Sequence, residues 1–248
     1  IHGCLVGSEM CIRDSRYTVW SNFQGPYILQ PIMARALRVS GNFLRLISAP
    51  FSGGSFGLKQ SIYPYIVLLA AASRISGLPL KWTEDRLEHL MASSSAADRA
   101  DELEAAFTSD GTLLGLRFKN CVNVGAYVRA PEPASVYRMH AASNGCYAVK
   151  NISIQNKLVS TNKMPVGLNR GYGGPQFYYG LERMMDLTAR KLNIDTAEIR
   201  RKNFIPEDQF PYHAPAGAIY DSGNYSEALD LLLKLSNYEN IKRRRKQA

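Results

Sequence analysis

The chain has 248 residues, of which 46% are hydrophobic and 21% charged, a composition typical of a globular protein with a sizeable core. Its net charge is +9, but five positive charges lie in the terminal run Lys242–Lys246, and the remainder carries +4. These values favour a solvated basic tail over a nucleic-acid-binding surface. No apolar run reaches the ~18 residues that a membrane span requires.

The first half of the chain alternates between strand-like and helix-like segments. In chain order, the patterns predict a strand at Arg16–Trp20, helical spacing over Gln30–Val39, a buried strand at Asn42–Pro50, a glycine-rich loop, a helix at Ser61–Gly77 and a strand at Leu78–Arg86. The helix Ser61–Gly77 is hydrophobic nearly all round, so we expect it to be buried. Pro64 suits its first turn and Gly77 its end.

The second half of the chain begins with strand-like patterns and ends with helix-like patterns. The patterns predict two long strands within Arg99–Val128 joined by a hairpin at Asp110–Gly111, a strand at Asn151–Asn162, a helix with one apolar face at Pro175–Asn193, a short helix capped by Asp195 or Thr196, and a helix at Tyr225–Leu235. The predicted fold class is α+β, with mixed sheets and packed helices.

Neither the chain ends nor the four cysteines indicate a binding or catalytic site. The cysteines form no Cys-x-x-Cys pair and no zinc-like spacing with histidine, so we expect no zinc or iron–sulfur cluster held by this chain alone. The segment CLVGSEMCIRDS resembles translated sequencing-adapter sequence. We therefore interpret residues 1–15 as a non-native leader, residues 16–236 as a partial domain and residues 237–248 as a basic truncated tail.

Two glycine-rich loops are candidates for binding a cofactor. In APFSGGSFGLKQ, Leu58 separates Gly57 from Lys59, and Gln60 stands where a phosphate-binding loop needs a hydroxyl. In GLNRGYGGPQ, Gln176 occupies the third glycine position of a dinucleotide fingerprint. A nucleotide site is therefore not favoured. The helix start after the second loop can hold an anionic oxygen, and the alternative is a tight structural turn.

Four segments, in order, resemble the molybdopterin-binding large subunit of the xanthine dehydrogenase, aldehyde oxidase and carbon monoxide dehydrogenase family. They are VWSNFQGPYILQPIMARAL, ISAPFSGGSFGLKQ, LPLKWTEDRLEHLMASS and NRGYGGPQFYYGLERMMDLTARKLNIDTAEIRRKNFI. By the family pattern, the chain is an internal third of such a subunit. The resemblance implies oxidative hydroxylation of an aldehyde or N-heteroaromatic substrate, with water as the oxygen source and molybdenum held through a molybdopterin rather than by side chains.

The resemblance also assigns roles to particular residues. Gln24 matches the glutamine that hydrogen-bonds the apical oxygen of molybdenum, and Arg170 matches an arginine beside the substrate pocket, so both are expected to be catalytic. Phe56 and Gly57 match positions whose backbone approaches the metal's oxo ligand. The expected cofactor-binding set is Gln24, Gly54, Phe56, Gly57, Arg170, Gly171, Gly173 and Gly174. Gln60 and Tyr172 are expected to line the substrate pocket.

Three departures from the family pattern bear on the chemistry. Gln60 replaces a ring-binding glutamate of purine hydroxylases, and Gly171 replaces a cysteine of the carbon monoxide enzymes, so neither xanthine nor carbon monoxide is the expected substrate. Ser55 replaces the usual third glycine of its loop. The chain contains no Gly-Glu dipeptide, so the family's general-base glutamate is expected outside it, and the fragment alone is expected to be inactive.

The resemblance implies a cytoplasmic enzyme, with the cofactor in its cytosine dinucleotide form and the chains arranged as a dimer of heterotrimers. Iron–sulfur clusters and FAD are expected in partner subunits. The alternatives are a non-catalytic basic nucleic-acid-binding module, with Lys and Arg gathered on one face, and an inactive fragment or pseudoenzyme. The enzyme hypothesis predicts that Gln24, Phe56 and Arg170 converge around one cleft.

Overall fold

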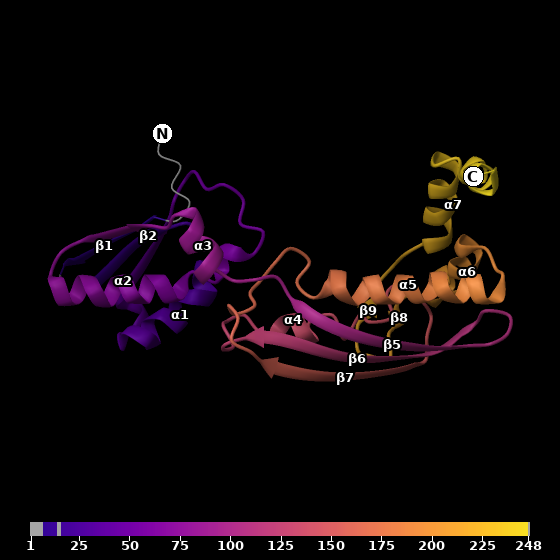
Figure 1. Cartoon of the computed structure of the whole chain (residues 1–248), viewed down its shortest axis with the longest axis horizontal. Helices are drawn as coiled ribbons and strands as arrows, with labels where there is room; N and C mark the ends of the chain where they lie inside the picture. The colour runs from indigo at the N-terminus through magenta and orange to yellow at the C-terminus, as the bar shows by residue number, and fades with distance from the viewer. Residues whose placement is uncertain (1–6, 14–15, 248) are drawn as a thin grey trace. The chain divides into compact units, whose positions relative to one another are not determined.

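The computed structural model describes residues 7–13 and 16–247, with side chains described from residue 16 onward (Figure 1). The chain divides into two compact units. Unit 1 comprises the chain up to Asp98 together with Asn123–Ser135 and Leu158–Tyr172, and unit 2 comprises Arg99–Val122, Val136–Lys157 and the chain from Gly173 onward. The combination of mixed sheet and packed helices confirms the predicted α+β class.

Unit 1 contains a four-stranded mixed sheet. Its strands are β1 (Gly7–Arg13), β2 (Arg16–Ser21), β3 (Leu44–Ser48) and β4 (Leu80–Thr83), in the order β3-β2-β1-β4. Strands β2 and β3 are parallel, whereas β1 is antiparallel to both β2 and β4. The segment Gly7–Arg13, which the adapter-like interpretation leaves out of the fold, therefore forms an inner strand. Whether residues 1–15 are native stays a prediction.

Helices α1 (Pro26–Leu37) and α2 (Tyr63–Ser76) pack on this sheet (Figure 1). The core that they enclose includes Val19, Met33 and Ile66, each fully buried. Helix α1 begins at Pro26 rather than at Gln30, because Pro26 is suited to a first helical turn and Gly25 adopts the left-handed conformation before it.

The expectation that the Ser61–Gly77 helix is buried all round was wrong. One face of α2 enters the core, but Leu68 is 68% exposed and Ile75 is 88% exposed. The apolar composition of a helix does not reveal how many of its faces have a neighbour. The predicted ends were correct: Pro64 lies in the first turn and Gly77 caps the C-terminus.

The strand predicted at Leu78–Arg86 was too long. Strand β4 ends at Thr83, and helix α3 (Arg86–Ala92) follows. Asp85 and Glu88 form a capping box, in which the Asp85 carboxylate accepts from the Glu88 N–H at 2.8 Å and the Glu88 carboxylate accepts from the Asp85 N–H at 2.9 Å. Two reciprocal backbone bonds therefore begin a helix where the sequence was interpreted as strand.

Unit 2 is built on the three-stranded sheet β5-β6-β7 (Asp98–Phe107, Leu113–Gly125 and Asn151–Ser160), whose strand ends run into unit 1. The Asp110–Gly111 hairpin joins β5 to β6, as predicted. Helix α5 (Gly174–Leu192) lies across one face of this sheet (Figure 1). Phe118, Leu181 and Met185 are buried between the sheet and the helix.

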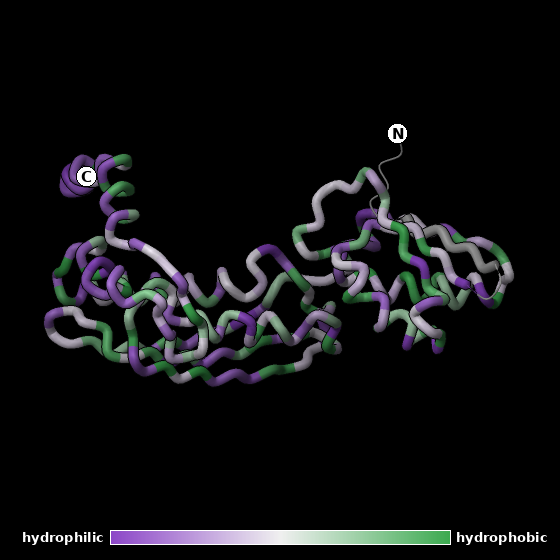
Figure 2. The backbone as a smooth tube through the Cα atoms, turned by 180° about the vertical axis from the view of Figure 1, so that it is seen from behind, coloured by the Kyte–Doolittle hydropathy of each residue, from purple (hydrophilic) through white to green (hydrophobic). Residues whose placement is uncertain are grey.

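The remaining elements are short or peripheral. They are α4 (Ala134–Tyr137), α6 (Thr196–Asn203), β8 (Tyr212–His213), β9 (Ile219–Tyr220), α7 (Tyr225–Leu235), α8 (Tyr238–Gln247) and the 3-10 turns η1 (Gly41–Phe43), η2 (Leu58–Gln60) and η3 (Glu207–Gln209). Asp195 caps α6, as predicted. The basic tail forms α8, which is hydrophilic along most of its length (Figure 2). In the described part of the chain, no helix has the length and apolarity of a membrane span.

Candidate functional site

The parallel pair β2 and β3 brings two of the predicted segments to one edge of the unit 1 sheet. Ser21 and Ser48 are paired at the ends of these strands, and the Ala49 N–H donates to the Ser21 carbonyl at 3.2 Å. Because parallel strands end at the same edge, the segment containing Gln24 and the glycine loop that follows β3 emerge side by side. Residues far apart in sequence therefore meet here.

The first glycine loop is held by its own polar groups. The Lys59 ammonium donates to the Ser52 hydroxyl at 2.9 Å and to the Gly53 carbonyl at 2.6 Å. The Ser55 hydroxyl accepts from the Lys59 backbone N–H at 3.2 Å and donates to the Gln24 side-chain oxygen. Lys59, to which the sequence assigned no role, thus has a structural one, and Ser55 connects the loop to Gln24.

The two glycine loops contact each other within unit 1. Gly57 has φ +108°, and a Cβ atom added there would lie 2.6 Å from the Leu168 carbonyl oxygen, in the second loop. Position 57 therefore requires glycine so that the two loops can contact each other, whether or not this backbone also contacts a cofactor. The Arg170 guanidinium lies over the Phe56 ring, 5.9 Å from its centroid, which is a cation–π geometry.

Phe56 presents its ring to the surface in an unusual backbone conformation. Its φ is +52° and its side chain is largely exposed, at 62%. A non-glycine residue with positive φ and an exposed aromatic ring is stabilised neither by its backbone nor by burial. Such a residue is therefore a reasonable candidate for contact with a bound group. A Cβ on Gly54 would contact this ring, at 2.8 Å, so Gly54 makes room for it.

The other predicted residues differ in burial and are divided between the two units. Gln60 is buried in η2, and Tyr172 is buried with φ +38°. Gly171 has φ +89° and is exposed. Gly173 and Gly174 belong to unit 2, where Gly173 is the left-handed N-cap of α5. The substrate and cofactor roles assigned to these residues stay predictions.

A cavity of about 110 Å³ lies in unit 1 beside the first loop, and sequence reasoning missed it. Its lining includes Gly54, Ser55, Lys59, Ser61, Tyr65, Glu84, His89, Ser94 and Arg129. Within the described residues, Arg129 Nε and Nη1, Glu84 Oε1 and the hydroxyls of Ser61 and Ser94 are buried without a hydrogen-bond partner. The other Glu84 oxygen lies 2.7 Å from His89 Nδ1.

The charged groups that line this cavity affect the pKa of Tyr65, which also lines it. Burial raises the pKa of Tyr65, and the positive charge of Arg129 opposes that rise. No motif connects Glu84, His89 and Arg129, because Glu84 follows β4, His89 lies in α3 and Arg129 lies in a loop distant in sequence. The sequence placed Glu84 within a predicted strand and gave no indication of the cavity.

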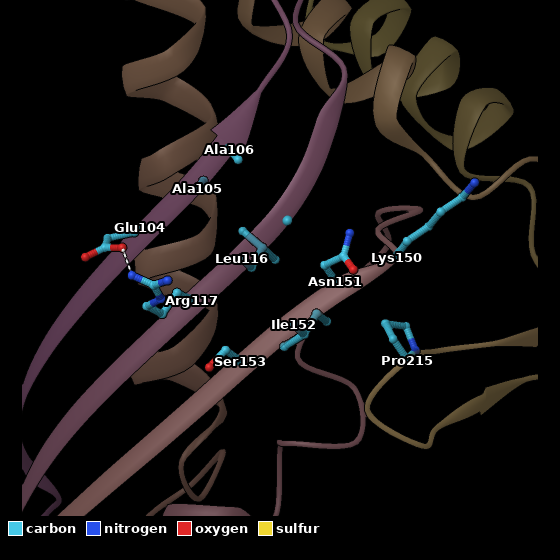
Figure 3. Close-up of a pocket in the computed structure, with 11 residues that line it drawn as sticks. Glu104, Ala105, Ala106, Leu116, Arg117, Lys150, Asn151, Ile152, Ser153 and Pro215 are labelled. Atoms are coloured by element: carbon cyan, nitrogen blue, oxygen red, sulfur yellow. Dashed lines mark hydrogen bonds and ion pairs between the residues drawn. The ribbon is translucent and has the colours of Figure 1, made fainter.

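A second hollow, of about 540 Å³, lies in unit 2 on the sheet β5-β6-β7 (Figure 3). The exposed pair Arg117 and Glu104, 2.8 Å apart, borders it, and none of the predicted site residues does. Within the described residues, no cluster of three His, Cys, Asp or Glu side chains could hold a metal ion. The candidate site is therefore the loop edge of unit 1.

Comparison with known proteins identifies close relatives. The chain is 36% identical over 240 residues to the carbon monoxide dehydrogenase large chain of Hydrogenophaga pseudoflava, covering 95% of this chain and 29% of the relative. It is 31% identical to the nicotine 6-hydroxylase large subunit of Paenarthrobacter nicotinovorans, covering 99% of this chain and 30% of the relative. The chain thus spans less than a third of the length of these relatives.

A solved structure of a related enzyme has a similar fold. Quinoline 2-oxidoreductase from Pseudomonas putida 86 superposes with a TM-score of 0.91 at 28% identity, over 98% of this chain and 31% of that structure. The profile of the molybdopterin cofactor-binding domain family matches residues 6–204. The chain therefore belongs to the molybdopterin cofactor-binding domain family, and the resemblance inferred from its four sequence segments is confirmed.

Proposed function

We propose that this chain is part of the cofactor-binding subunit of a molybdenum hydroxylase, which hydroxylates an N-heteroaromatic or aldehyde substrate with oxygen from water. The main support is the meeting of the Gln24 segment, the first glycine loop and the Arg170 loop at one edge of unit 1. Family membership supports the cofactor class, and the loop contacts support its location.

The residues present fit a molybdopterin, which is rich in hydrogen-bonding groups and includes phosphate. In unit 1, Gln24 is hydrogen-bonded through its oxygen, and its amide nitrogen makes no hydrogen bond within the described residues. Taken by itself, the N-terminus of α5 has no side-chain cap. Unpaired donors at a helix N-terminus suit an anionic oxygen.

When bound, the cofactor would supply a Lewis-acidic metal that accepts two electrons. The Gln24 amide would donate a hydrogen bond to an oxygen of the cofactor without adding charge. The exposed Phe56 would place its backbone beside the cofactor. The Arg170 guanidinium, held over Phe56, would favour negative charge that develops on the substrate.

An N-heteroaromatic is the favoured substrate class. Nicotine 6-hydroxylase and quinoline 2-oxidoreductase are named for substrates of this class. Gly171 provides no thiol, and Gln60 provides a neutral amide rather than a carboxylate. Without a carboxylate, position 60 offers no charged acceptor for the N–H groups of a purine ring.

The finer assignments extend the same proposal. We expect iron–sulfur and flavin subunits as partners, FAD in the flavin subunit, the cytosine dinucleotide form of the cofactor, a dimer of heterotrimers and a cytoplasmic location. Relatives named as subunits of larger enzymes support the partner subunits. The general-base glutamate would be supplied from outside this chain.

The experiment is Gln24→Ala in the holoenzyme, assayed with quinoline, nicotine and benzaldehyde. We expect turnover to fall about 100-fold, the typical effect of removing one donor from a charge-stabilising site. Molybdenum content, measured by mass spectrometry, should not change. Gln155→Ala, at an exposed position on β7, is the matched control and should behave like wild type. Unchanged turnover in Gln24→Ala would contradict the assigned role of Gln24.

A further inference from the structure

We infer that Ser55 is a positioning residue that sets the orientation of the Gln24 amide. Its hydroxyl binds the amide oxygen and thereby turns the amide nitrogen toward the cofactor. This inference rests on the proposed function of Gln24. It concerns a position where the family resemblance predicts glycine, so the contact is a feature of this chain rather than of the family pattern.

The direction of the contact follows from counting protons. A serine hydroxyl has one proton to donate and two lone pairs that can accept. The Lys59 backbone N–H, 3.2 Å away, donates to one of these lone pairs of Ser55 Oγ. The hydroxyl proton is then available for the Gln24 side-chain oxygen, which is its partner.

This contact distinguishes the two ends of the amide. A glutamine amide can rotate by half a turn, which exchanges its oxygen and its nitrogen at nearly constant shape. In the other orientation, the amide N–H would donate to the second lone pair of Ser55 Oγ, but the hydroxyl proton would lose Gln24 Oε1, its only acceptor within the described residues. Without Ser55, both orientations become accessible, and the fraction that presents N–H to the cofactor falls.

The loop holds Ser55 in place without strain. The Lys59 ammonium binds Ser52 and Gly53 on the N-terminal side, and Gly57 contacts the second loop on the other. Ser55 is not among the residues with positive φ, so alanine can adopt its backbone conformation. Removing the hydroxyl takes away the side-chain bond to the Lys59 N–H, but the turn keeps the backbone bond from the Leu58 N–H to the Ser55 carbonyl at 3.1 Å.

The experiment compares Ser55→Ala, Ser55→Thr and wild type in the holoenzyme. The first readout is the paramagnetic resonance spectrum of Mo(V) after partial reduction with dithionite, which requires no knowledge of the substrate. Ser55→Ala should broaden or split the signal, because two amide orientations are populated, and kcat for quinoline should fall about three- to tenfold, as expected for one lost hydrogen bond. Ser55→Thr retains a hydroxyl and should restore the wild-type spectrum.

Two controls separate positioning from general damage. Ser153→Ala, at an exposed position on β7, should leave the spectrum and kcat unchanged. In a Gln24→Ala background, Ser55→Ala should have no further effect, because the group that it orients is gone. If Ser55→Ala loses molybdenum, Ser55→Gly is the second variant. It also removes the hydroxyl, and it introduces the residue that the family pattern predicts. Loss of molybdenum in both would overturn the inference in favour of a role in retaining the cofactor.

The outcomes distinguish this inference from the function on which it rests. A wild-type spectrum and kcat in Ser55→Ala, together with slow turnover in Gln24→Ala, would overturn the role of Ser55 alone. Additive effects of the two substitutions would do the same. Unchanged turnover in Gln24→Ala would instead remove the assigned role of Gln24, and with it the basis for the inference.

Discussion

The two units treat their buried polar groups differently. In unit 2, Arg200 binds Glu182 at 2.8 Å and Asp186 at 3.0 Å, and the buried Tyr147 hydroxyl donates to the same Glu182 at 2.8 Å. In unit 1, Arg129 Nε and Glu84 Oε1 are buried without a partner within the described residues. Buried polar groups are almost always satisfied in folded proteins. The network around Arg200 and Tyr147 forms a closed framework in unit 2, although Gln176 Oε1 and Ser143 Oγ of that unit also lack a partner within the described residues. In unit 1, the unpaired groups gather beside the loop edge.

The sharpest test of the framework is Asn203, at the end of α6. Its amide donates to the Gly111 and Ile199 carbonyls, both at 2.8 Å, and its oxygen accepts from the Leu113 N–H at 2.7 Å. Asn203→Ala leaves buried backbone groups unsatisfied and should cost about 3 kcal/mol locally.

Hydrogen exchange of the β5–β6 hairpin in the holoenzyme measures this loss. Asn151→Ala, which removes an exposed bond to the Leu114 carbonyl, is the control and should change protection little. Unchanged protection of the hairpin in Asn203→Ala would show that unit 2 is not the closed framework described above.

The next largest effect is expected at the contact between the glycine loops. Gly57→Ala combines a strained positive φ with a clash at the Leu168 carbonyl and should destabilise the loop by about 2 kcal/mol. Its molybdenum content should fall. Gly53→Ala is the matched control, because a Cβ atom there meets nothing within 4 Å. Equal molybdenum content in the two variants would contradict the view that the loop contact shapes the site.

A pH effect is expected from the partly buried Cys146 thiol of unit 2. Burial, and secondarily the charge of Glu182, raises the pKa of Cys146 to about 11. Because the folded state keeps this proton longer than the unfolded state, the stability contributed by the thiol is complete below the unfolded pKa, ~8.5, and is lost as pH rises toward 11. Alkylation of Cys146 by iodoacetamide should be slow at pH 8 and accelerate toward pH 11. Rapid alkylation at pH 8 would indicate that unit 2 opens locally.

The smallest effect is expected on the exposed sheet surface of unit 2. Arg117 and Glu104 are both about half exposed, and exposed ion pairs contribute ~0.5 kcal/mol or less. Glu104→Gln should therefore leave hydrogen exchange in β5 and β6 within a few tenths of a kcal/mol of wild type, with Arg117→Gln as the paired variant. A large loss of protection would mean that this surface belongs to the framework.

Much of the fold could be predicted because its local patterns are strong. The Asp110–Gly111 hairpin, the apolar face of α5 and the Asp195 cap each depend on residues close in sequence. The prediction failed where a decision depended on distant neighbours. Helix α2 is apolar on most sides, yet only packing determines which side is covered, and the capping box at Asp85 competes with the strand preference of the residues before it.

The residues of the candidate site can likewise be separated into those that local motifs predicted and those that only the tertiary structure brings together. Its glycines and Gln24 were accessible through motifs, whereas the cavity formed by Glu84, His89 and Arg129 has no local pattern. The Ser55–Gln24 contact joins residues 31 positions apart, and Ser55 could be noted in the sequence only as a departure from glycine.

By itself, the sequence determined the family, the glycine-rich character of the two loops and the alternation of strands and helices, because all of these depend on residue type and short-range spacing. Tertiary structure alone decided that the loops touch, that Gly57 is needed for their contact with Leu168, and that Ser55 binds Gln24. The physical reason is the parallel pairing of β2 with β3, which places the ends of two separate segments at one edge of a sheet.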